Sequence, residues 1–292
     1  MDNRSDIRDF LAGRRARITP AQAGLPAGGG RRRVPGLRRE EVAVLAGVST
    51  EWYTRLEKGH IAGVSEDVLE AVARALQLDE AERIYLFDLA RAAKPTRGPQ
   101  RRSKAQVHPR VQWMLDSMTA SAAFVSNGRL DIVATNSLGR ALHSPMFDGR
   151  RPANFARFQF LDPRARDYYQ DWDGAANITV ALLRAEAGRH PHDAQLRELV
   201  GELSTLSEEF RSRWAAHDVR IHHAGAKQFH HPVVGPLDLV YCTLDLPAED
   251  HRGLRLTIYT AEPGSPSEDA LTLLASWAAT TADAIAPATG RP

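Results

Sequence analysis

The residues with types and spacing best suited to chemistry lie within residues 38–59, which have the pattern of two short helices joined by a tight turn. Gly47 stands where such a turn needs a positive φ angle, which glycine adopts at least cost. Ser49 is then placed to cap a second helix that carries Thr50 and Arg55 on its exposed side. Arginine pairs with guanine O6 and N7, and threonine contacts base edges or the thymine methyl group. The segment therefore predicts a helix that reads base edges in the major groove of DNA.

Other residues around this turn are expected to contact the DNA backbone. Arg39 leads the first helix and is expected to reach a phosphate or a base edge. Lys58 and the arginines of residues 31–33 are expected to contact phosphates, which position a protein without specifying the sequence. A plain helical hairpin inside a bundle is the alternative, which the combined small, glycine and apolar positions around the turn disfavour. The predicted DNA-binding residues are Arg31, Arg32, Arg33, Arg38, Arg39, Ser49, Thr50, Glu51, Trp52, Thr54, Arg55 and Lys58.

A second group of residues is suited to binding an apolar molecule. Six aromatic side chains fall within residues 155–172, and Trp113 is a further candidate. An apolar pocket with a few polar anchors fits a hydrophobic tail with a polar head, and Arg164, Arg166 or Arg220 is a candidate partner for a carboxylate head. For any single aromatic residue, packing in the core is the commoner role. The predicted ligand-binding residues are Trp113, Phe155, Phe158, Tyr168, Tyr169, Trp172, Arg220 and His231.

The histidines and the single cysteine do not form a recognisable catalytic or metal site. Five histidines lie within residues 217–231, but adjacent histidines on a strand point to opposite faces, whereas metal sites need ligands on one face. We therefore expect structural or anchoring histidines, and no metal or cofactor. No Gly-x-Ser-x-Gly or Walker-type loop is present, and Cys242 has the neighbours of a small core residue rather than of a nucleophile. These features predict a protein that is not an enzyme.

Charge is unevenly distributed along the chain and marks a boundary. Residues 1–104 hold 20 Lys and Arg against 14 Asp and Glu, whereas residues 105–292 hold 18 against 22. The basic excess of the first part is expected for a domain with a polyanionic partner. Residues 94–106 combine prolines, a glycine and clustered cations, which predicts an exposed linker, either a plain tether or a segment that also touches phosphate. The predicted domains are therefore residues 1–93 and 107–287.

The first domain has the apolar periodicity of about five short helices. Leu45 is expected on the inner face of the first helix of the turn, and Tyr53 in the core. Asp79 is expected to cap a later helix that carries Ile84 and Leu86. An all-α, five-helix, helix-turn-helix domain is the prediction for this part of the chain.

The second domain mixes strand and helix signals. Asn127-Gly128 suits a primed two-residue turn, which predicts a β-hairpin over residues 122–134. Ser267 is expected to cap a last helix that runs through Trp277. Strands that flank a helical insert favour an α+β fold with one mainly antiparallel sheet. The other predicted elements are helices over residues 164–188 and 192–217, and strands over residues 226–231, 237–244 and 254–260.

Several strings of residues resemble a known family. Residues 37–92 are similar to the helix-turn-helix domains of the Xre class, which are related to phage repressors. The string over residues 24–43, followed by Trp52-Tyr53 and residues 56–59, more specifically resembles the MmyB-like regulators, which are common in actinobacteria. Matching strings occur in the second half, over residues 225–235 and 259–265, and the third glycine of residues 28–30 is a departure that only lengthens a loop. The resemblance implies a PAS-like second domain that binds a small molecule, with fatty-acid-like molecules as the ligand class.

These observations predict a ligand-responsive transcription regulator that binds a double-stranded DNA operator. A single recognition helix covers about one half-site, so a homodimer is expected. No apolar run approaches the ~18 residues needed to span a bilayer, and the start lacks the apolar segment of a signal peptide, so a cytoplasmic protein without a membrane partner is expected. Two alternatives remain: a second domain that serves only dimerisation or recruitment of a partner protein, and an enzyme with a DNA-binding appendage.

Overall fold

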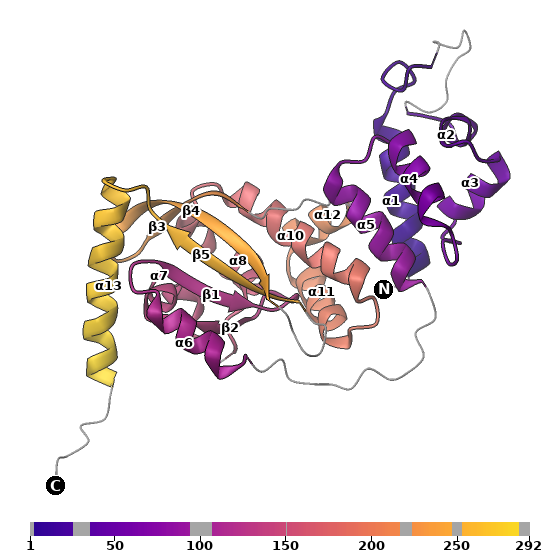
Figure 1. Ribbon diagram of the computed structural model, residues 1–292. Helices are drawn as coiled ribbons and strands as arrows, with labels where there is room; N and C mark the ends of the chain where they lie inside the picture. Colours follow the sequence, from indigo (N-terminus) through magenta and orange to yellow (C-terminus); the bar gives the residue numbers. More distant parts are fainter. Residues whose placement is uncertain are drawn as a thin grey trace. The chain divides into compact units, whose positions relative to one another are not determined.

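The computed structural model describes residues 3–25, 36–93, 107–149, 151–216, 224–246 and 253–285 (Figure 1). The chain forms two compact units. Unit 1 holds the described residues within Met1–Pro99, Ala181–Gly201 and Ser212–Ile221. Unit 2 holds those within Gln100–Val180, Glu202–Arg211 and His222–Pro292. The linker predicted over residues 94–106 lies outside the described residues, and the predicted domain boundaries stay predictions.

Unit 1 begins with five helices around a common apolar core, as the sequence predicts. The apolar residues of the first helix, among them Ile7, Phe10 and Leu11, are fully buried in this core. Asp79 caps the fifth helix as predicted, because its carboxylate accepts a 2.8 Å hydrogen bond from the backbone N–H of Glu82. The helices are α1 (Asn3–Arg17), α2 (Arg39–Ala46), α3 (Thr50–Glu57), α4 (Glu66–Ala75) and α5 (Glu80–Ala92).

The turn between α2 and α3 has the predicted geometry. Gly47 ends α2 with a φ angle of 67°, and the hydroxyl of Ser49 caps α3 by accepting a 3.1 Å hydrogen bond from the backbone N–H of Trp52. One assignment of an inner-face residue is wrong. Leu45 is 36% exposed, whereas Val42, Ala43 and Ala46 of the same helix are buried, because residues i, i+1 and i+4 share the inner face and Leu45 lies to one side of it.

Unit 2 is built around a five-stranded antiparallel sheet, which confirms the predicted α+β class. The strand order is β2-β1-β5-β4-β3, so the last strand of the chain lies beside the first. Pro236 is the second residue of β4, close to the start of the strand, where a residue that cannot donate a ladder hydrogen bond is tolerated. The strands are β1 (Ala122–Ser126), β2 (Ile132–Thr135), β3 (Ala224–His231), β4 (Gly235–Leu246) and β5 (Leu254–Thr260).

The hairpin of β1 and β2 is present, but its turn differs from the predicted two-residue type. The side-chain oxygen of Asn127 accepts hydrogen bonds of 2.9 and 3.0 Å from the backbone N–H groups of Arg129 and Asp131. The positive φ angle, 66°, falls on Leu130 and not on Gly128. The Asn127 side chain therefore organises a longer loop, which local Asn-Gly chemistry does not anticipate.

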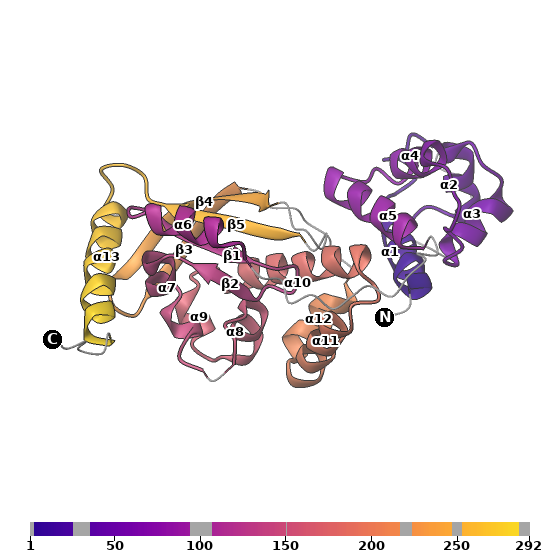
Figure 2. The ribbon, with the colours of Figure 1, turned by 60° about the horizontal axis from the view of Figure 1, so that its bottom comes forward.

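Helices cover the two faces of the sheet unequally. Figure 2 shows α7, α8 and α9 gathered on one side of the sheet, and the elements of this side share one apolar cluster with the inward residues of β3, β4 and β5. On the opposite face, Leu115 of α6 packs on Ala123, Val125, Leu254 and Leu256. The helices after the first five are α6 (Pro109–Ser117), α7 (Ser137–Leu142), η1 (Ser144–Met146), α8 (Phe155–Leu161), α9 (Ala165–Tyr168), α10 (Trp172–Arg189), α11 (Ala194–Leu206), α12 (Glu208–Ala215) and α13 (Pro266–Ile285).

The last helix begins and ends elsewhere than predicted. It starts at Pro266, and the hydroxyl of Ser265 accepts a hydrogen bond of 3.3 Å from the backbone N–H of Glu268. Ser267 instead accepts a 2.9 Å hydrogen bond from the backbone N–H of Asp238, so it ties the helix to β4. The helix continues past Trp277 to Ile285, which the sequence prediction cut short.

Strand β4 has one buried and one open face. Leu237 and Leu239 are buried, whereas Val240 and Leu244, on the other face, are 48% and 51% exposed. Cys242 lies on this open face and is exposed, so its prediction as a core residue is wrong. The strand alternates by the usual period of two, and the apolar neighbours of Cys242 in the sequence therefore said little about its own burial.

Candidate DNA-reading helix and candidate ligand site

Helix α3 presents the predicted reading residues to solvent. Thr50, Glu51 and Arg55 are exposed, and Arg55 pairs with no carboxylate in the described part of the chain. Thr54 is partly buried, and Trp52 packs partly against the core of unit 1, which limits how far its ring extends from the helix. The outward side of α3 therefore offers a hydroxyl, a carboxylate and a guanidinium within two turns.

The flanking cations occupy different situations. Arg38 and Lys58 are exposed just before α2 and just after α3. Arg38 makes a 3.3 Å ion pair with Glu40. Because both side chains are exposed to solvent, this pair adds little to the stability of the fold. The predicted phosphate contacts at residues 31–33 lie outside the described residues. The hydroxyl oxygen of Ser49 accepts the capping hydrogen bond of α3, so this hydroxyl has a structural role in the helix-turn-helix.

A buried carboxylate, which sequence reasoning missed, fixes the position of α3. Glu57 is 1% exposed, and its two oxygens accept hydrogen bonds of 2.9 and 3.0 Å from Arg15 of α1. Arg39 of α2 donates two more, of 3.0 and 2.8 Å. Burial alone would raise the pKa of Glu57, but the hydrogen bonds and charges of the two guanidinium groups lower it. The Glu57 carboxylate therefore joins α1, α2 and α3, and it restricts the movement of the Arg39 side chain.

The aromatic residues predicted for a ligand site converge in unit 2. Phe155, Phe158, Tyr168, Tyr169 and Trp172 all belong to or pack against one apolar cluster. Residues from strands that the prediction did not include complete the cluster: Phe124, Phe229 and Tyr259. The ring centroids of Phe229 and Tyr259 are 5.5 Å apart, and those of Tyr168 and Phe229 are 5.3 Å apart. We call this group of eight residues the aromatic cluster.

His143 lies at the centre of the aromatic cluster and is fully buried. Its ring centroid is 5.1 Å from that of Phe155, 5.3 Å from that of Phe124 and 5.9 Å from that of Tyr259. Burial lowers the pKa of His143 to about 3, with the charges of Lys227 and His231 as further causes. The imidazole is therefore neutral near pH 7. No pattern in the sequence singled out this histidine.

Two local features place His143. Asn136 caps α7, and its side-chain oxygen accepts hydrogen bonds from the backbone N–H groups of Gly139 (2.7 Å) and Ala123 (3.0 Å). An added Cβ at Gly139 would collide with the carbonyl oxygen of Ala123 and lie 2.6 Å from the Thr135 hydroxyl, so glycine permits the close approach of α7 to β1. His143 directly follows α7 and takes its position from this contact.

Lys227 supplies a cation at the edge of the aromatic cluster. Its ammonium nitrogen lies 4.6 Å from the ring centroid of Tyr169 and 5.9 Å from that of Phe229. Burial lowers the pKa of Lys227 to about 8, and no carboxylate among the described residues opposes this effect. The sequence held a signal for this residue, because Lys227, Phe229 and His231 alternate along one face of β3.

The other predicted polar anchors are engaged or lie elsewhere. Arg164 makes ion pairs of 2.7 Å with both Asp148 and Asp162, and Arg166 stacks 4.1 Å from the ring centroid of Trp172. His231 is buried. Trp113 is 69% exposed on α6, apart from the aromatic cluster, and Arg220 lies outside the described residues.

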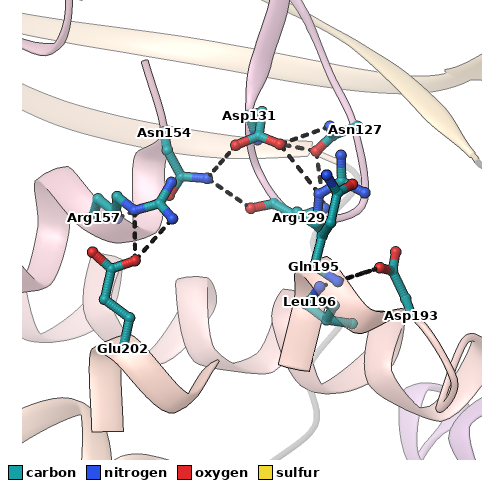
Figure 3. A network of polar contacts seen from close by, with 9 residues as sticks. All are labelled: Asn127, Arg129, Asp131, Asn154, Arg157, Asp193, Gln195, Leu196 and Glu202. Carbon is teal, nitrogen blue, oxygen red and sulfur yellow. Dashed lines mark hydrogen bonds and ion pairs between the residues drawn. The ribbon is translucent and has the colours of Figure 1, made fainter. Parts of the chain in front are cut away.

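A polar network holds α8, which carries two residues of the aromatic cluster (Figure 3). The side chain of Asn154 caps α8 and donates a 2.8 Å hydrogen bond to Asp131. Asp131 in turn accepts one of 2.9 Å from Asn127 in the hairpin loop. Arg157 donates bonds of 3.0 and 2.8 Å to Glu202, and this guanidinium lowers the pKa of the Glu202 carboxyl. The hairpin loop that replaced the predicted two-residue turn therefore serves to anchor α8.

Two family models match the chain. A model described as the MmyB-like transcription regulator ligand binding domain matches residues 107–274, and one described as a helix-turn-helix domain matches residues 6–86. The comparison with curated proteins found no match. Among the described residues, no helix is long and apolar enough to cross a membrane, and no His, Cys, Asp and Glu side chains gather in a group that could hold a metal ion. Because the first match alone covers more than half of the chain, the protein belongs to the MmyB-like family, DNA-binding transcription regulators with a helix-turn-helix domain and a ligand-binding domain.

Proposed function

We propose that this regulator binds its operator sequence-specifically as a homodimer in the cytoplasm, and that its second unit senses a small apolar acid of the fatty-acid class. The observation that carries the ligand class is Lys227, a cation without a carboxylate partner among the described residues, set against the rings of Tyr169 and Phe229. Lys227 is half-buried, and an ammonium partly removed from water is disfavoured unless it is paired, so a ligand carboxylate would stabilise it. In this proposal Lys227, and not one of the arginines predicted from the sequence, pairs with the carboxylate head of the ligand.

The aromatic cluster supports the apolar part of this ligand. It joins the predicted Phe155, Phe158, Tyr168, Tyr169 and Trp172 with residues from three strands, and an alkyl chain is matched by such rings. His231 forms part of the supporting wall, since its ring lies on the same face of β3 as Lys227. Trp113 and Arg220 stay outside this proposal, because the first is exposed on α6 and the second lies outside the described residues.

The proposal for DNA binding rests on the outward side of α3. Arg55 and Thr50 read base edges. Glu51 disfavours DNA sites that place a hydrogen-bond acceptor opposite its carboxylate. Trp52 and Thr54 are partly buried and lie beside these contacts. Arg38 and Lys58 contact phosphates, and so do the arginines at residues 31–33. Arg39 has two of its nitrogens bonded to Glu57 but is half-exposed, so it presents its remaining nitrogen to a phosphate. Two such helices in a homodimer would read two half-sites about one helical turn apart.

Ligand and operator must be coupled for the protein to respond. A ligand changes operator affinity only if it prefers one of two arrangements of the protein, and operator binding then changes ligand affinity by the same factor. The test uses the full chain after removal of bound lipid, with tetradecanoic acid as the probe and an operator selected from a random duplex pool. Native mass spectrometry should show one acid per chain, and fluorescence anisotropy should show a changed operator affinity. If no acid binds at concentrations that leave the fold intact, the sensing function is wrong.

A second candidate function has its own observation. Val240 and Leu244 on β4, and Leu273 and Trp277 on α13, are large apolar residues that are exposed on unit 2. Exposed apolar residues of this kind favour a unit that serves only dimerisation or recruitment of a partner protein. This function predicts that the full chain forms an oligomer in native mass spectra and that no acid is bound to it. The double substitution Val240→Ser and Leu244→Ser should then dissociate the oligomer.

A further inference from the structure

Two buried histidines of unit 2 differ in whether their nitrogens are paired. In His231, Nε2 lies 3.0 Å from the carbonyl oxygen of Ala141, and Nδ1 accepts a hydrogen bond of 3.2 Å from the backbone N–H of Val233. Both nitrogens therefore have partners. In His143, Nδ1 lies 3.1 Å from the Tyr168 hydroxyl, whereas Nε2 is buried and has no hydrogen-bond partner among the described residues. An unpaired buried polar atom is uncommon and calls for a reason.

The hydrogen bonds around His143 fix which nitrogen carries the proton. The Tyr168 hydroxyl donates its single proton to the carbonyl oxygen of Leu142 at 2.7 Å. It can then only accept at its contact with Nδ1, so Nδ1 of His143 is the protonated nitrogen. Because burial keeps this imidazole neutral, Nε2 carries no proton and is an acceptor. Aromatic carbon surrounds it, since the rings of Phe124, Phe155 and Tyr259 pack around His143.

We infer that Nε2 of His143 accepts a hydrogen bond from the ligand, and that the ligand therefore carries a hydroxyl or amide N–H group in addition to its acidic head. The inference rests on the proposed ligand function and sharpens it, because a plain fatty acid paired with Lys227 leaves Nε2 unpaired. A group that can only accept, such as an ether or an ester, repels the lone pair of Nε2. The site thus selects among amphiphiles of equal length by the presence of a donor.

The test compares two isomeric probes on the full chain: 1-dodecanol, which has a hydroxyl donor, and methyl undecyl ether, which has none. An alkanol has no acidic head to pair with Lys227, so that residue does not fix the position of its hydroxyl relative to Nε2. Isothermal titration calorimetry should give roughly ten- to hundredfold tighter binding of the alcohol. Tetradecanoic acid is titrated in parallel, as the probe of the proposed function itself.

Three variants separate the acceptor from its surroundings. His143→Phe should remove the preference for the alcohol or reverse it, because the acceptor is gone. Tyr168→Phe should weaken the preference, because Nδ1 loses the partner that forces its protonation. Phe124→Leu is the matched control: it trims a ring beside His143 without touching a polar atom, so both probes should weaken together and their ratio should persist.

A measurement on the unaltered protein tests the inference even if the variants fail to fold. The ¹⁵N resonance of His143 Nε2 should be that of an unprotonated nitrogen, and should shift toward the hydrogen-bonded value with 1-dodecanol but not with the ether. Equal affinities of the two probes, with tetradecanoic acid bound, would overturn the donor requirement and leave the proposed function standing. Failure of all three probes to bind would overturn both. A preference for the alcohol that survives in His143→Phe would assign the donor to another residue and overturn the inference.

Discussion

Arg15 and Glu57 are 42 positions apart in the sequence, yet the guanidinium of Arg15 donates hydrogen bonds of 2.9 and 3.0 Å to the two carboxylate oxygens of Glu57. This fork-to-fork pair joins α1 to α3, the proposed reading helix, and Arg39 completes it from α2. A helix that reads base edges must hold its side chains at fixed positions, so under the proposed function this pair bears on specificity.

Replacing the buried carboxylate should destabilise unit 1. In Glu57→Gln, the charge that both guanidinium groups share is lost, and at least one buried N–H group loses its acceptor. Breaking a buried pair in this way costs about 3–5 kcal/mol. Urea unfolding followed by circular dichroism should show the loss. Glu51→Gln on the exposed side of the same helix is the control, with a change within about 0.5 kcal/mol. Equal effects of the two substitutions would contradict the structural role of Glu57.

The same carboxylate should make the stability of unit 1 depend on pH. The pKa of Glu57 is lowered in the folded protein, so its contribution is fully present above the unfolded value, about 4.3, and is lost as the pH falls through the lower folded value. Other carboxylates titrate in the same range. The difference in unfolding free energy between the unaltered protein and Glu57→Gln should therefore be followed from about pH 6 downward, and it should shrink. A difference that stays constant or grows on acidification would show that the pKa of Glu57 is not lowered in the folded protein.

Two cations of the reading region should behave differently on DNA. Arg55→Ala should cost about 1–3 kcal/mol on the selected operator and relax specificity at one base pair, because a base-edge contact is lost. Lys58→Ala should weaken binding to operator and random duplex equally and flatten the salt dependence, because a phosphate contact is lost. Anisotropy titrations on both duplexes at several salt concentrations separate the two patterns. Equal loss on operator and random DNA for Arg55→Ala would remove it from base reading.

Lys227 should discriminate between acidic and neutral amphiphiles. Lys227→Met keeps an apolar chain of similar length but removes the ammonium, so the affinity for tetradecanoic acid should fall by roughly tenfold or more. The affinity for 1-dodecanol should stay within about twofold, since that probe has no charge to pair. Gln228→Ala, on the outward face of the same strand, controls for general damage to β3. A parallel loss of both probes in Lys227→Met would indicate a packing role instead of a charge contact.

The close approach of α7 to β1 should make Gly139 intolerant of a side chain. Gly139→Ala places a Cβ against the carbonyl oxygen of Ala123 and the Thr135 hydroxyl, and such overpacking costs about 1–3 kcal/mol. Gly201 in α11 is a matched control, because an added Cβ there meets nothing within 4 Å. Gly201→Ala should raise the stability by about 0.5–1 kcal/mol, as expected inside a helix. Thermal unfolding should therefore move in opposite directions for the two substitutions.

Features that depend on neighbours in the sequence were predicted well. Gly47 and Ser49 punctuate α2 and α3 through local rules, and both have the predicted conformation or hydrogen bond. The five helices and the strands after residue 220 also follow from periodicity, although Leu45 was wrongly placed on the inner face of α2. An error at one residue is expected in a helix of only eight residues, because two turns define its face poorly.

Features that depend on distant partners could not be predicted. His143 gains its role from Tyr168, which is 25 positions away, and from rings of four separate segments, so no local pattern marks it. No local pattern marks Glu57 either, because its buried ion pair depends on Arg15, 42 positions away. The aromatic residues of 155–172 were recognisable because hydrophobicity itself drives them inward. Lys227 was within reach of the sequence, since strand alternation places it on the same face as Phe229.

The open face of β4 has a practical consequence for spectroscopy. Cys242 is the only cysteine of the sequence, and its thiol is exposed there. A maleimide dye will therefore label the natural protein at one defined position, without removal of other thiols. The adjacent Tyr241 packs against Tyr259 of the aromatic cluster, with ring centroids 5.7 Å apart. A fluorophore on Cys242 would lie on the opposite face of the sheet, next in the chain to a residue that contacts the aromatic cluster, so its emission is suited to following changes in β4 when an acid is added.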